Sequence, residues 1–477
     1  MTRSLIAALL LAATTPLAAQ TPAAPLPTPT PAPSSPPRYL PTVPKAVADI
    51  RDAALADEYA WDIVEGLTVE VGQRMGGTEA EARARDWAVT KLKAMGFANV
   101  HVERFAMPVW TRGPEAAEIV APFPQRLVVT ALGNSASTPA QGIVGEIVGF
   151  DSVADLIAAP DSAVRGKIVF VSHAMPRTQD GSGYGFFGGP RRQGPSIASR
   201  KGAIGIVVRS IGTDHHRNPH AGGQQFEPGV APIPAGALSL PDAEQLQRIL
   251  KRGKSVTMRL TLVSSVRPGE SGNVIAEVPG RDPKAPILMV GGHLDSWDLG
   301  TGAIDDGAGV AITTASAKQI MDAGRPLRTI RVVWFGAEEM GLYGGMFYKD
   351  IHGREAHHSI AESDFGAERI WKVDSKFGKA RAAEAKALQA ALAPLGIVPG
   401  SLEAADGSDI GPMIEDGLPA VGLSQNGTYY FDLHHTPDDT LDKIDPEALR
   451  QNVAAWTAML AVLSGGIEPK PKAHKRR

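Results

Sequence analysis

From about residue 270 to the end, short apolar runs alternate with longer runs of helical periodicity, and this alternation constrains the fold most. The runs predict strands at 273–278, 287–290 and 329–335, and helices at about 307–323, 380–395 and 446–463. Such an alternation is typical of α/β proteins, in which helices cover the faces of a largely parallel sheet. We therefore expect an α/β sandwich, with functional residues at the C-terminal ends of its strands.

A histidine and five acidic residues stand just past these predicted strands. They are His293, Asp295, Asp305, Asp306, Glu338 and Glu339. Taken singly, they have structural explanations, such as a buried histidine, a helix cap or an acidic helix start. Together, an imidazole and several carboxylates at one sheet edge can bind a divalent cation, while one free carboxylate handles protons. The pattern therefore favours metal-dependent hydrolysis.

Three roles follow from the spacing of these residues. If His293 binds metal, Asp295 can reach back and fix the tautomer of its imidazole. One carboxylate of the Asp305-Asp306 pair can bridge two cations. In the pair Glu338-Glu339, one glutamate can bind metal while its neighbour accepts the proton of the attacking water.

The N-terminus has the layout of a secretory signal peptide at 1–20, with cleavage expected after Ala19 or Gln20. Its apolar run is shorter than the ~20 residues that span a bilayer, so no membrane anchor is expected. Residues 21–38 are proline-rich and predict an extended linker. Since the chain has no cysteine, disulfides are excluded. We expect an exported protein, periplasmic or secreted.

Changes in residue composition and predicted secondary structure mark the expected domain boundaries in the rest of the chain. Residues 39–139 begin a folded domain, in which Thr78 and Glu81 form a capping-box pair and Gly96 ends the helix. Residues 140–262 are predicted to form an inserted β-rich domain, 263–466 the catalytic part, and 467–477 a basic tail. The net charge of −3 gives no basic face for nucleic acid.

Two features of the predicted insert invite a functional interpretation. The glycine-rich run 181–190 lacks a following Lys-Ser/Thr, so a phosphate-binding role is rejected in favour of a flexible surface loop, or a lid over a substrate cleft. His215, His216 and His220 lack carboxylates at ligand spacing, and we expect them to be solvent-exposed loop residues.

These motifs resemble the zinc-dependent exopeptidases that use two co-catalytic zinc ions, and the resemblance covers 273–463. Within the insert, the runs at 209–210, 218–222, 233–235 and 242–244 resemble the carboxypeptidase Q branch of that family. The resemblance implies a mixed-sheet α/β/α sandwich with an inserted, β-rich, protease-associated-like domain.

The resemblance also implies the site residues. Five residues would bind two zinc ions: His293, Asp305 as the bridge, Glu339, Asp364 and His435. Glu338 would be the general base, supported by Asp295. Asp374 is the second choice for the position given to Asp364. His434 stands where some relatives place a tyrosine that steadies the oxyanion; a supporting or merely packed histidine is the alternative.

The implied activity is that of a carboxypeptidase or dipeptidase acting on short peptides, with an aminopeptidase as the alternative. A carboxypeptidase needs a cation for the substrate carboxylate, and Arg191, Arg192 and Lys201 are candidates that no motif places. A non-catalytic receptor-like protein and a glutaminyl cyclase are further alternatives. The resemblance suggests a homodimer, and no membrane partner is expected.

Overall fold

The computed structural model describes residues 40–470. The predicted signal peptide at 1–20 and the linker at 21–38 lie outside the described residues, as do 471–477. Within 40–470, no helix combines the length and apolar character needed to cross a membrane.

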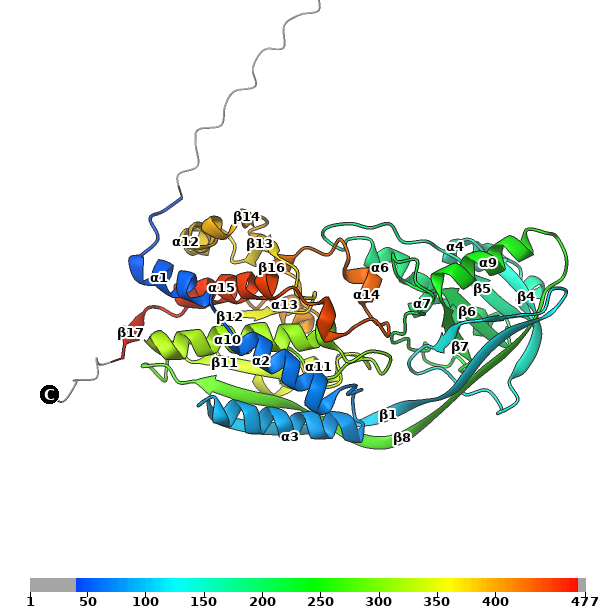
Figure 1. Cartoon of the computed structure of the whole chain (residues 1–477), viewed down its shortest axis with the longest axis horizontal. Helices are drawn as coiled ribbons and strands as arrows, with labels where there is room; N and C mark the ends of the chain where they lie inside the picture. The colour runs from blue at the N-terminus through cyan, green and yellow to red at the C-terminus, as the bar shows by residue number, and fades with distance from the viewer. Residues whose placement is uncertain (1–39, 471–477) are drawn as a thin grey trace, which may run out of the picture. The chain divides into compact units, whose positions relative to one another are not determined.

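The centre of the main sheet consists of four neighbouring strands, in the order β12-β9-β11-β8 (Figure 1). They are β12 (His357–Glu362), β9 (Ile287–His293), β11 (Ile330–Phe335) and β8 (Thr257–Val278). β12, β9 and β11 are parallel, whereas β8 pairs with β11 in the antiparallel direction. The mixed α/β sheet predicted from the sequence is therefore confirmed. The predicted strand at 273–278 is only the end of the much longer β8.

Helices cover both faces of this centre, because alternate residues of its strands are buried on opposite sides. Val332 and Trp334 of β11 belong to the larger core, while Val333 and Phe335 belong to a smaller one. The larger core is formed with α1 (Lys45–Ala54), α2 (Tyr59–Gly66), α3 (Glu79–Ala94), α10 (Ala308–Ala323) and α15 (Pro446–Leu463). The smaller core is formed with α11 (Tyr343–His352) and α13 (Gly411–Glu415).

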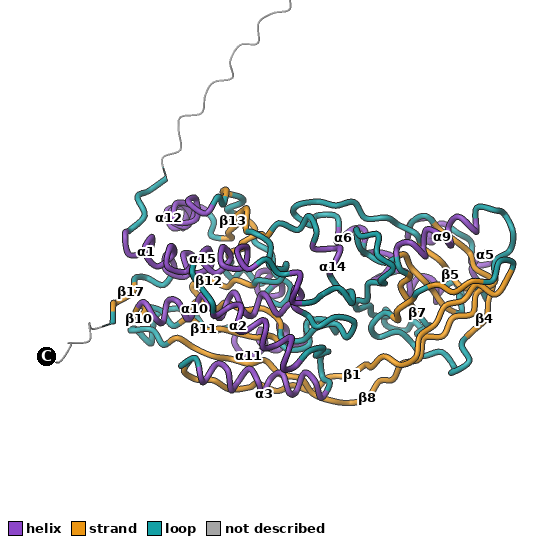
Figure 2. Tube along the Cα trace, viewed as in Figure 1, coloured by secondary structure: helices purple, strands orange, loops and turns teal. Residues whose placement is uncertain are grey.

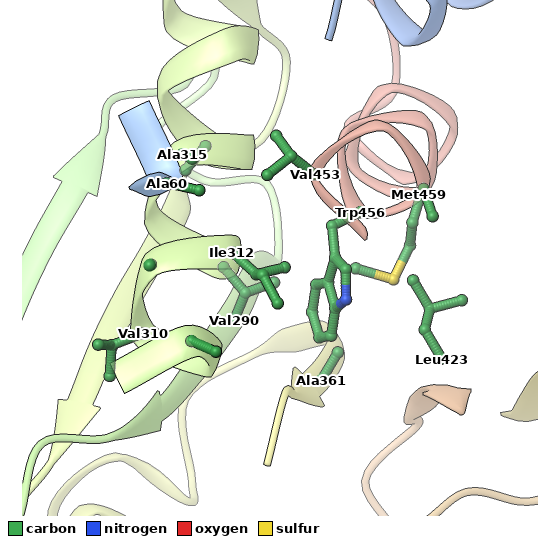
Figure 3. Close-up of a cluster of buried hydrophobic side chains, with 14 of the residues drawn as sticks. Ala60, Val290, Val310, Ile312, Ala315, Ala361, Leu423, Val453, Trp456 and Met459 are labelled. Carbon is green, nitrogen blue, oxygen red and sulfur yellow. The ribbon is translucent and has the colours of Figure 1, made fainter. Parts of the chain in front are cut away.

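Trp456 of α15 is the fully buried centre of the larger core. Figure 3 shows its ring between Ile312 of α10 and Leu423, with Ala361 beyond it. The helix starts where the sequence predicts, at Pro446, because the Asp445 side chain accepts a hydrogen bond from the Glu447 N–H and proline is tolerated in the first turn.

A second group of strands extends the same sheet beyond β8, in the order β4-β5-β6-β7-β3. These are β4 (Ile143–Phe150), β5 (Ile168–Val171), β6 (Gly205–Arg209), β7 (Ala235–Leu238) and β3 (Val129–Ala131). Short helices accompany them: α4 (Val153–Ala158), α5 (Asp161–Val164), α6 (Tyr184–Phe187), α7 (Gly189–Arg192), α8 (Gly194–Arg200) and α9 (Leu240–Leu250).

β1 (Ala98–Ala121) and β8 connect the two groups of strands. They pair antiparallel along almost their whole length, from Ala98 opposite Glu277 to Ala121 opposite Thr257. Figure 2 shows them as two long strands running side by side. Because β8 passes through residue 262 without interruption, the two groups share one hydrogen-bonded framework. The insert boundaries of 140–262 stay a prediction.

The other strands are short or lie outside the main sheet. They are β2 (Gln125–Leu127), β10 (Gly324–Pro326), β13 (Ile370–Lys376), β14 (Val398–Pro399), β15 (Glu403–Ala404), β16 (Val421–Gln425) and β17 (Ile467–Pro469). The remaining short helices are α12 (Ala382–Leu392) and α14 (Tyr430–Leu433). β17 pairs with β10, so the predicted tail begins with a strand.

The predicted cap of α3 forms with one difference. Thr78 Oγ1 accepts a hydrogen bond from the Glu81 N–H at 3.3 Å, as expected. The Glu81 carboxylate accepts a hydrogen bond from the Gly77 N–H instead of returning to Thr78, and it also pairs with Arg85 and accepts from Ser271 at 2.8 Å. The helix therefore starts on a buried ion pair that also contacts β8.

His352 joins α11 to β1 through carboxylates, and this contact makes the stability of the fold depend on pH. Its Nε2 lies 3.0 Å from Glu103 Oε1 and its Nδ1 lies 2.7 Å from Glu355 Oε1. The hydrogen bond to Glu103 outweighs burial and raises the pKa of His352 above its ordinary value of 6.5. The stabilisation is therefore fully present below pH 6.5 and is lost as the pH rises through the folded-state pKa.

We predict that His352→Gln lowers the free energy of unfolding at pH 6 by about 0.2–1 kcal/mol, the range of a partly exposed ion pair. The difference from the unsubstituted protein should shrink steadily toward pH 9. Urea unfolding at several pH values measures it, with His215→Gln, an exposed histidine, as the control. A difference that stays constant from pH 6 to pH 9 would contradict the assignment.

Candidate metal and catalytic site

The structure brings the five predicted metal ligands to one edge of the sheet. His293 ends β9, Asp305 precedes α10, Glu339 follows β11, Asp364 follows β12, and His435 follows α14. His293, Glu339 and Asp364 lie together because β9, β11 and β12 are parallel, so their C-terminal ends meet at the same edge. Asp305 reaches them from the segment between β9 and α10.

Asp305 lies between two halves of this cluster. Its Oδ1 is 3.0 Å from His293 Nε2, which in turn lies 3.4 Å from Asp364 Oδ1. Its Oδ2 is 3.2 Å from His435 Nε2, which in turn lies 3.1 Å from Glu339 Oε2. Ligand atoms of His293, Asp305 and Glu339 all fall within 4.8 Å of one another. One carboxylate thus faces a potential ligand set on each side.

The cluster fits divalent metal because its buried charges lack other compensation. Asp305 Oδ2 and Glu339 Oε1 are buried without a hydrogen-bond partner. Burial raises the pKa of Glu339 to about 7. Burial alone would lower the pKa of His435, but the negative charge of Glu339 and the nearby Asp305 carboxylate raise it to about 10. Imidazole nitrogens and carboxylate oxygens that converge in this way form a typical zinc donor set.

Glu338 borders the cluster without belonging to its ligand groups. It lines the adjoining cavity, and its backbone N–H donates a hydrogen bond of 3.0 Å to Asp295 Oδ1. Burial raises the pKa of Glu338 well above its usual range. Glu338 therefore lies where the sequence analysis expects a free carboxylate, and its role as the base stays a prediction.

Asp295 acts on its neighbours differently from what was predicted. His293 Nδ1 lies 3.0 Å from the backbone oxygen of Asp295 but 3.7 Å from its carboxylate oxygen Oδ1. The nearer partner of the imidazole is therefore the carbonyl group. The Asp295 carboxylate instead fixes the backbone of Glu338.

Three further buried residues hold the ligand loops: the sequence analysis considered Asp306 only as the other member of the possible bridging pair, and it gave Asp439 and Arg74 no role. Asp306 accepts hydrogen bonds from the His293 N–H and the Gly309 N–H, both at 3.0 Å. Asp439 accepts from the Ile304 N–H at 2.6 Å. Arg74 donates to the carbonyl oxygens of Leu294, Thr301 and Gly302. Asp439 stands in the motif that contains His435, whereas Arg74 belongs to no motif and only the fold reveals it.

The sequence analysis left the roles of His434 and Asp374 open. The His434 ring stacks on His435 with centroids 3.4 Å apart, and its Nε2 lies 3.5 Å from Asp305 Oδ2. Its role in steadying an oxyanion stays a prediction. Asp374 lies on β13 with its carboxylate 2.8 Å from Lys372 Nζ, outside the ligand groups, so the structure brings Asp364 rather than Asp374 beside His293.

The segment 218–222 holds the backbone that carries His435. His220 Nδ1 lies 2.8 Å from the His434 carbonyl oxygen, and its Nε2 lies 2.5 Å from Asp214 Oδ2. The Ala221 N–H donates to the His435 oxygen at 2.9 Å, and His435 Nδ1 lies 3.2 Å from the Ala221 oxygen. These contacts hold His435 in a left-handed conformation with φ of 63°. His215 and His216 are exposed as expected, although His216 Nδ1 lies 2.8 Å from Asp438 Oδ2. The prediction of an exposed loop residue without a carboxylate partner was wrong for His220, which is buried against Asp214.

The glycine-rich run 181–190 is not a featureless surface loop, because it forms α6 and the start of α7. Tyr184 stacks on Phe431 with ring centroids 4.7 Å apart, and its hydroxyl accepts a hydrogen bond of 2.5 Å from Arg191. Together with the metal cluster, this segment encloses a cavity of about 510 Å³ that Tyr184, Arg191, Arg192 and Gln224 also line. Lys201, the third predicted cation, donates to the Ala159 oxygen and lies outside this lining.

A His/Asp/Glu cluster at the C-terminal edge of a mixed α/β sheet, with a free carboxylate beside it, defines a metal-dependent hydrolase. The chain belongs to Peptidase family M28, whose family model matches residues 273–460. It is therefore a peptide hydrolase.

Known relatives match almost the whole chain. Carboxypeptidase Q from Bos taurus is 32% identical over 438 residues, and the match covers 90% of each chain. Leucine aminopeptidase 2 from Arthroderma otae is 26% identical, and the match covers 82% of this chain and 80% of the relative. The crystal structure of a Peptidase M28 precursor from Shewanella amazonensis SB2B is similar with a TM-score of 0.86 and 46% identity, covering 90% of this chain and 98% of that one. A zinc aminopeptidase from Bacillus subtilis shares the fold, with a TM-score of 0.63 and 19% identity, covering 86% of this chain and 98% of that one.

We predict that His220→Ala reduces zinc content or hydrolytic rate about 10- to 100-fold, the usual effect of losing a residue that orients a metal ligand. Zinc analysis and a peptide-hydrolysis assay measure the two quantities. His215→Ala is the matched control, because it removes an exposed histidine of the same loop. A His220→Ala protein with normal zinc content and normal rate would show that this contact does not position the ligand.

Proposed function

We propose that this peptidase is an exopeptidase with two zinc ions that hydrolyses short peptides or dipeptides in the manner of a carboxypeptidase or dipeptidase. The observation that carries the proposal is the placement of Asp305 between the His293–Asp364 pair and the His435–Glu339 pair. A bridging carboxylate with a nitrogen and a second carboxylate on each side suits two cations better than one. The similarity to Carboxypeptidase Q supports the substrate class.

When bound, the metal ions polarise the scissile carbonyl group and make a water molecule more acidic. Glu338 is the group proposed to accept the proton of that water and deliver it to the leaving amine. Its half-buried side chain lines the cavity, and the Asp295 carboxylate accepts a hydrogen bond from its backbone N–H. Burial raises the pKa of Glu338, which makes its carboxylate a stronger proton acceptor than an exposed glutamate.

An aminopeptidase is the second candidate, favoured by the similarity to Leucine aminopeptidase 2. Both activities use the same metal chemistry and differ in which free terminus the cavity recognises. A panel of dipeptides with one or the other terminus blocked distinguishes them.

We predict that Glu338→Gln retains zinc but hydrolyses dipeptides at least ~100-fold more slowly, because the amide cannot accept a proton. Zinc analysis and initial rates on one dipeptide measure the effect. Glu339→Gln is the matched contrast: this neighbour is a proposed ligand, so its replacement should lower zinc content as well. If Glu338→Gln hydrolysed the dipeptide at the unsubstituted rate, the assignment of the base would be wrong.

We also propose that the protein is exported. The predicted signal peptide at 1–20 supports export, as does the 46% identical relative, whose name describes a precursor. Expression in a bacterial host should yield a periplasmic or secreted protein whose N-terminal sequence begins after Ala19 or Gln20. Full-length protein confined to the cytosol, with Met1 retained, would contradict this.

A further inference from the structure

Two neighbouring arginines line the cavity without a carboxylate partner. Within residues 40–470, the polar partners of Arg191 are the Ala221 oxygen, the Tyr184 hydroxyl and the His435 ring, and those of Arg192 are the carbonyl oxygens of Tyr184 and Gly185. Other buried arginines in this part of the chain do have carboxylate partners: Arg51 with Asp52, Arg85 with Glu81, and Arg209 with Glu244. Arg74 lacks one too, but four carbonyl oxygens accept its hydrogen bonds and it lies away from the cavity lining.

Several buried polar atoms around these arginines are also unsatisfied. Arg191 is 6% exposed and its Nε has no hydrogen-bond partner. Gln224 is 3% exposed, lines the same cavity, and has a partner for neither Oε1 nor Nε2. Buried donors of this kind are costly unless a ligand completes them. The three side chains therefore indicate that a polar ligand group belongs between them.

The charged residues that line the cavity indicate whether the ligand group is an anion or a cation. The four acidic residues of the lining are Asp305, Glu338, Glu339 and Asp364, all of which are assigned to the metal ions or to proton transfer. Arg191 and Arg192 are the remaining charged residues of the wall besides the histidines. Burial and the positive charge of Arg191 lower the pKa of Arg192, as expected for two cations without a counter-ion. The wall is therefore complementary to an anion and offers no spare carboxylate to an ammonium group.

We propose that Arg191, Arg192 and Gln224 form a subsite that binds the free α-carboxylate of the substrate. This inference rests on the proposed exopeptidase function and adds to it the terminus that the enzyme requires. Guanidinium groups bind carboxylates through paired, charge-assisted hydrogen bonds, and the Gln224 amide supplies a further donor. The preferred substrates are dipeptides and short peptides whose C-terminus is unblocked, with the scissile bond next to that terminus.

Hydrolysis of matched substrates tests the subsite. The zinc-loaded protein should cleave a dipeptide about 10- to 150-fold more efficiently than the corresponding dipeptide amide, the range expected from losing one charged hydrogen-bond partner. Arg192→Ala should raise the KM of the free dipeptide by at least ~10-fold with kcat little changed, and should leave the amide unaffected. Arg192→Lys should restore part of the difference, and Gln224→Ala should act in the same direction as Arg192→Ala.

Arg200→Ala is the matched control, because Arg200 lies on the same segment but pairs with Glu227 at the surface. Zinc content and melting temperature should be the same for all these variants and the unsubstituted protein. Arg191 is not the primary variant, because it also contacts His435 and its replacement would disturb a proposed ligand.

Calorimetric binding provides a readout that does not depend on turnover. Glycyl-sarcosine, whose tertiary amide resists hydrolysis, should bind at least ~10-fold more tightly than glycyl-sarcosinamide, and Arg192→Ala should abolish that preference. If this preference is found but no dipeptide is hydrolysed, the subsite stands and the proposed function fails. If dipeptides are hydrolysed but the free acid and the amide react and bind equally, or a free amine is required instead, the subsite is overturned.

Discussion

The structure depends on the convergence of buried negative charge at one edge of a mixed sheet. Asp305, Glu339 and the less deeply buried Asp364 meet two histidines there, and the buried carboxylates of Asp306, Glu362 and Asp409 lie close to them. So much buried charge is destabilising unless cations compensate it. The same side chains that make the site costly without metal are the ones proposed to bind it, and Glu338 lies beside them outside the ligand groups.

A second layer of residues holds this convergence in place, and it comes from both groups of strands. Asp306, Asp439 and Arg74 fix the loops around His293 and Asp305. His220 and Ala221, from the segment between β6 and β7, hold the backbone of His435. The second group of strands is therefore not only a wall of the cavity but a support for one of the proposed ligands.

The sequence predicted the parts of the molecule that depend on local pattern. Apolar runs and caps located β9, β11, α10 and α15 to within a few residues, because burial on both faces of a parallel sheet leaves a clear signature. The family resemblance identified the residues that cluster at the strand ends. Supporting contacts between residues far apart in the sequence were not predictable. Arg74 lies 220 residues before its hydrogen-bond partner Leu294, and His220 lies 214 residues before His434. Nothing in the local pattern around these residues distinguishes a buried support from an exposed loop.

The paired strands β1 and β8 have an evolutionary consequence. They run from the strands that carry the metal cluster to the second group of strands, whose helix α7 carries the arginine pair. Replacing the second group of strands with an unrelated module would break the hydrogen bonds between β1 and β8. It would also remove the contacts that hold the backbone of His435. New specificities in such an enzyme are thus expected to arise through point replacements around 184–192 and 220–225, while the architecture itself is inherited whole.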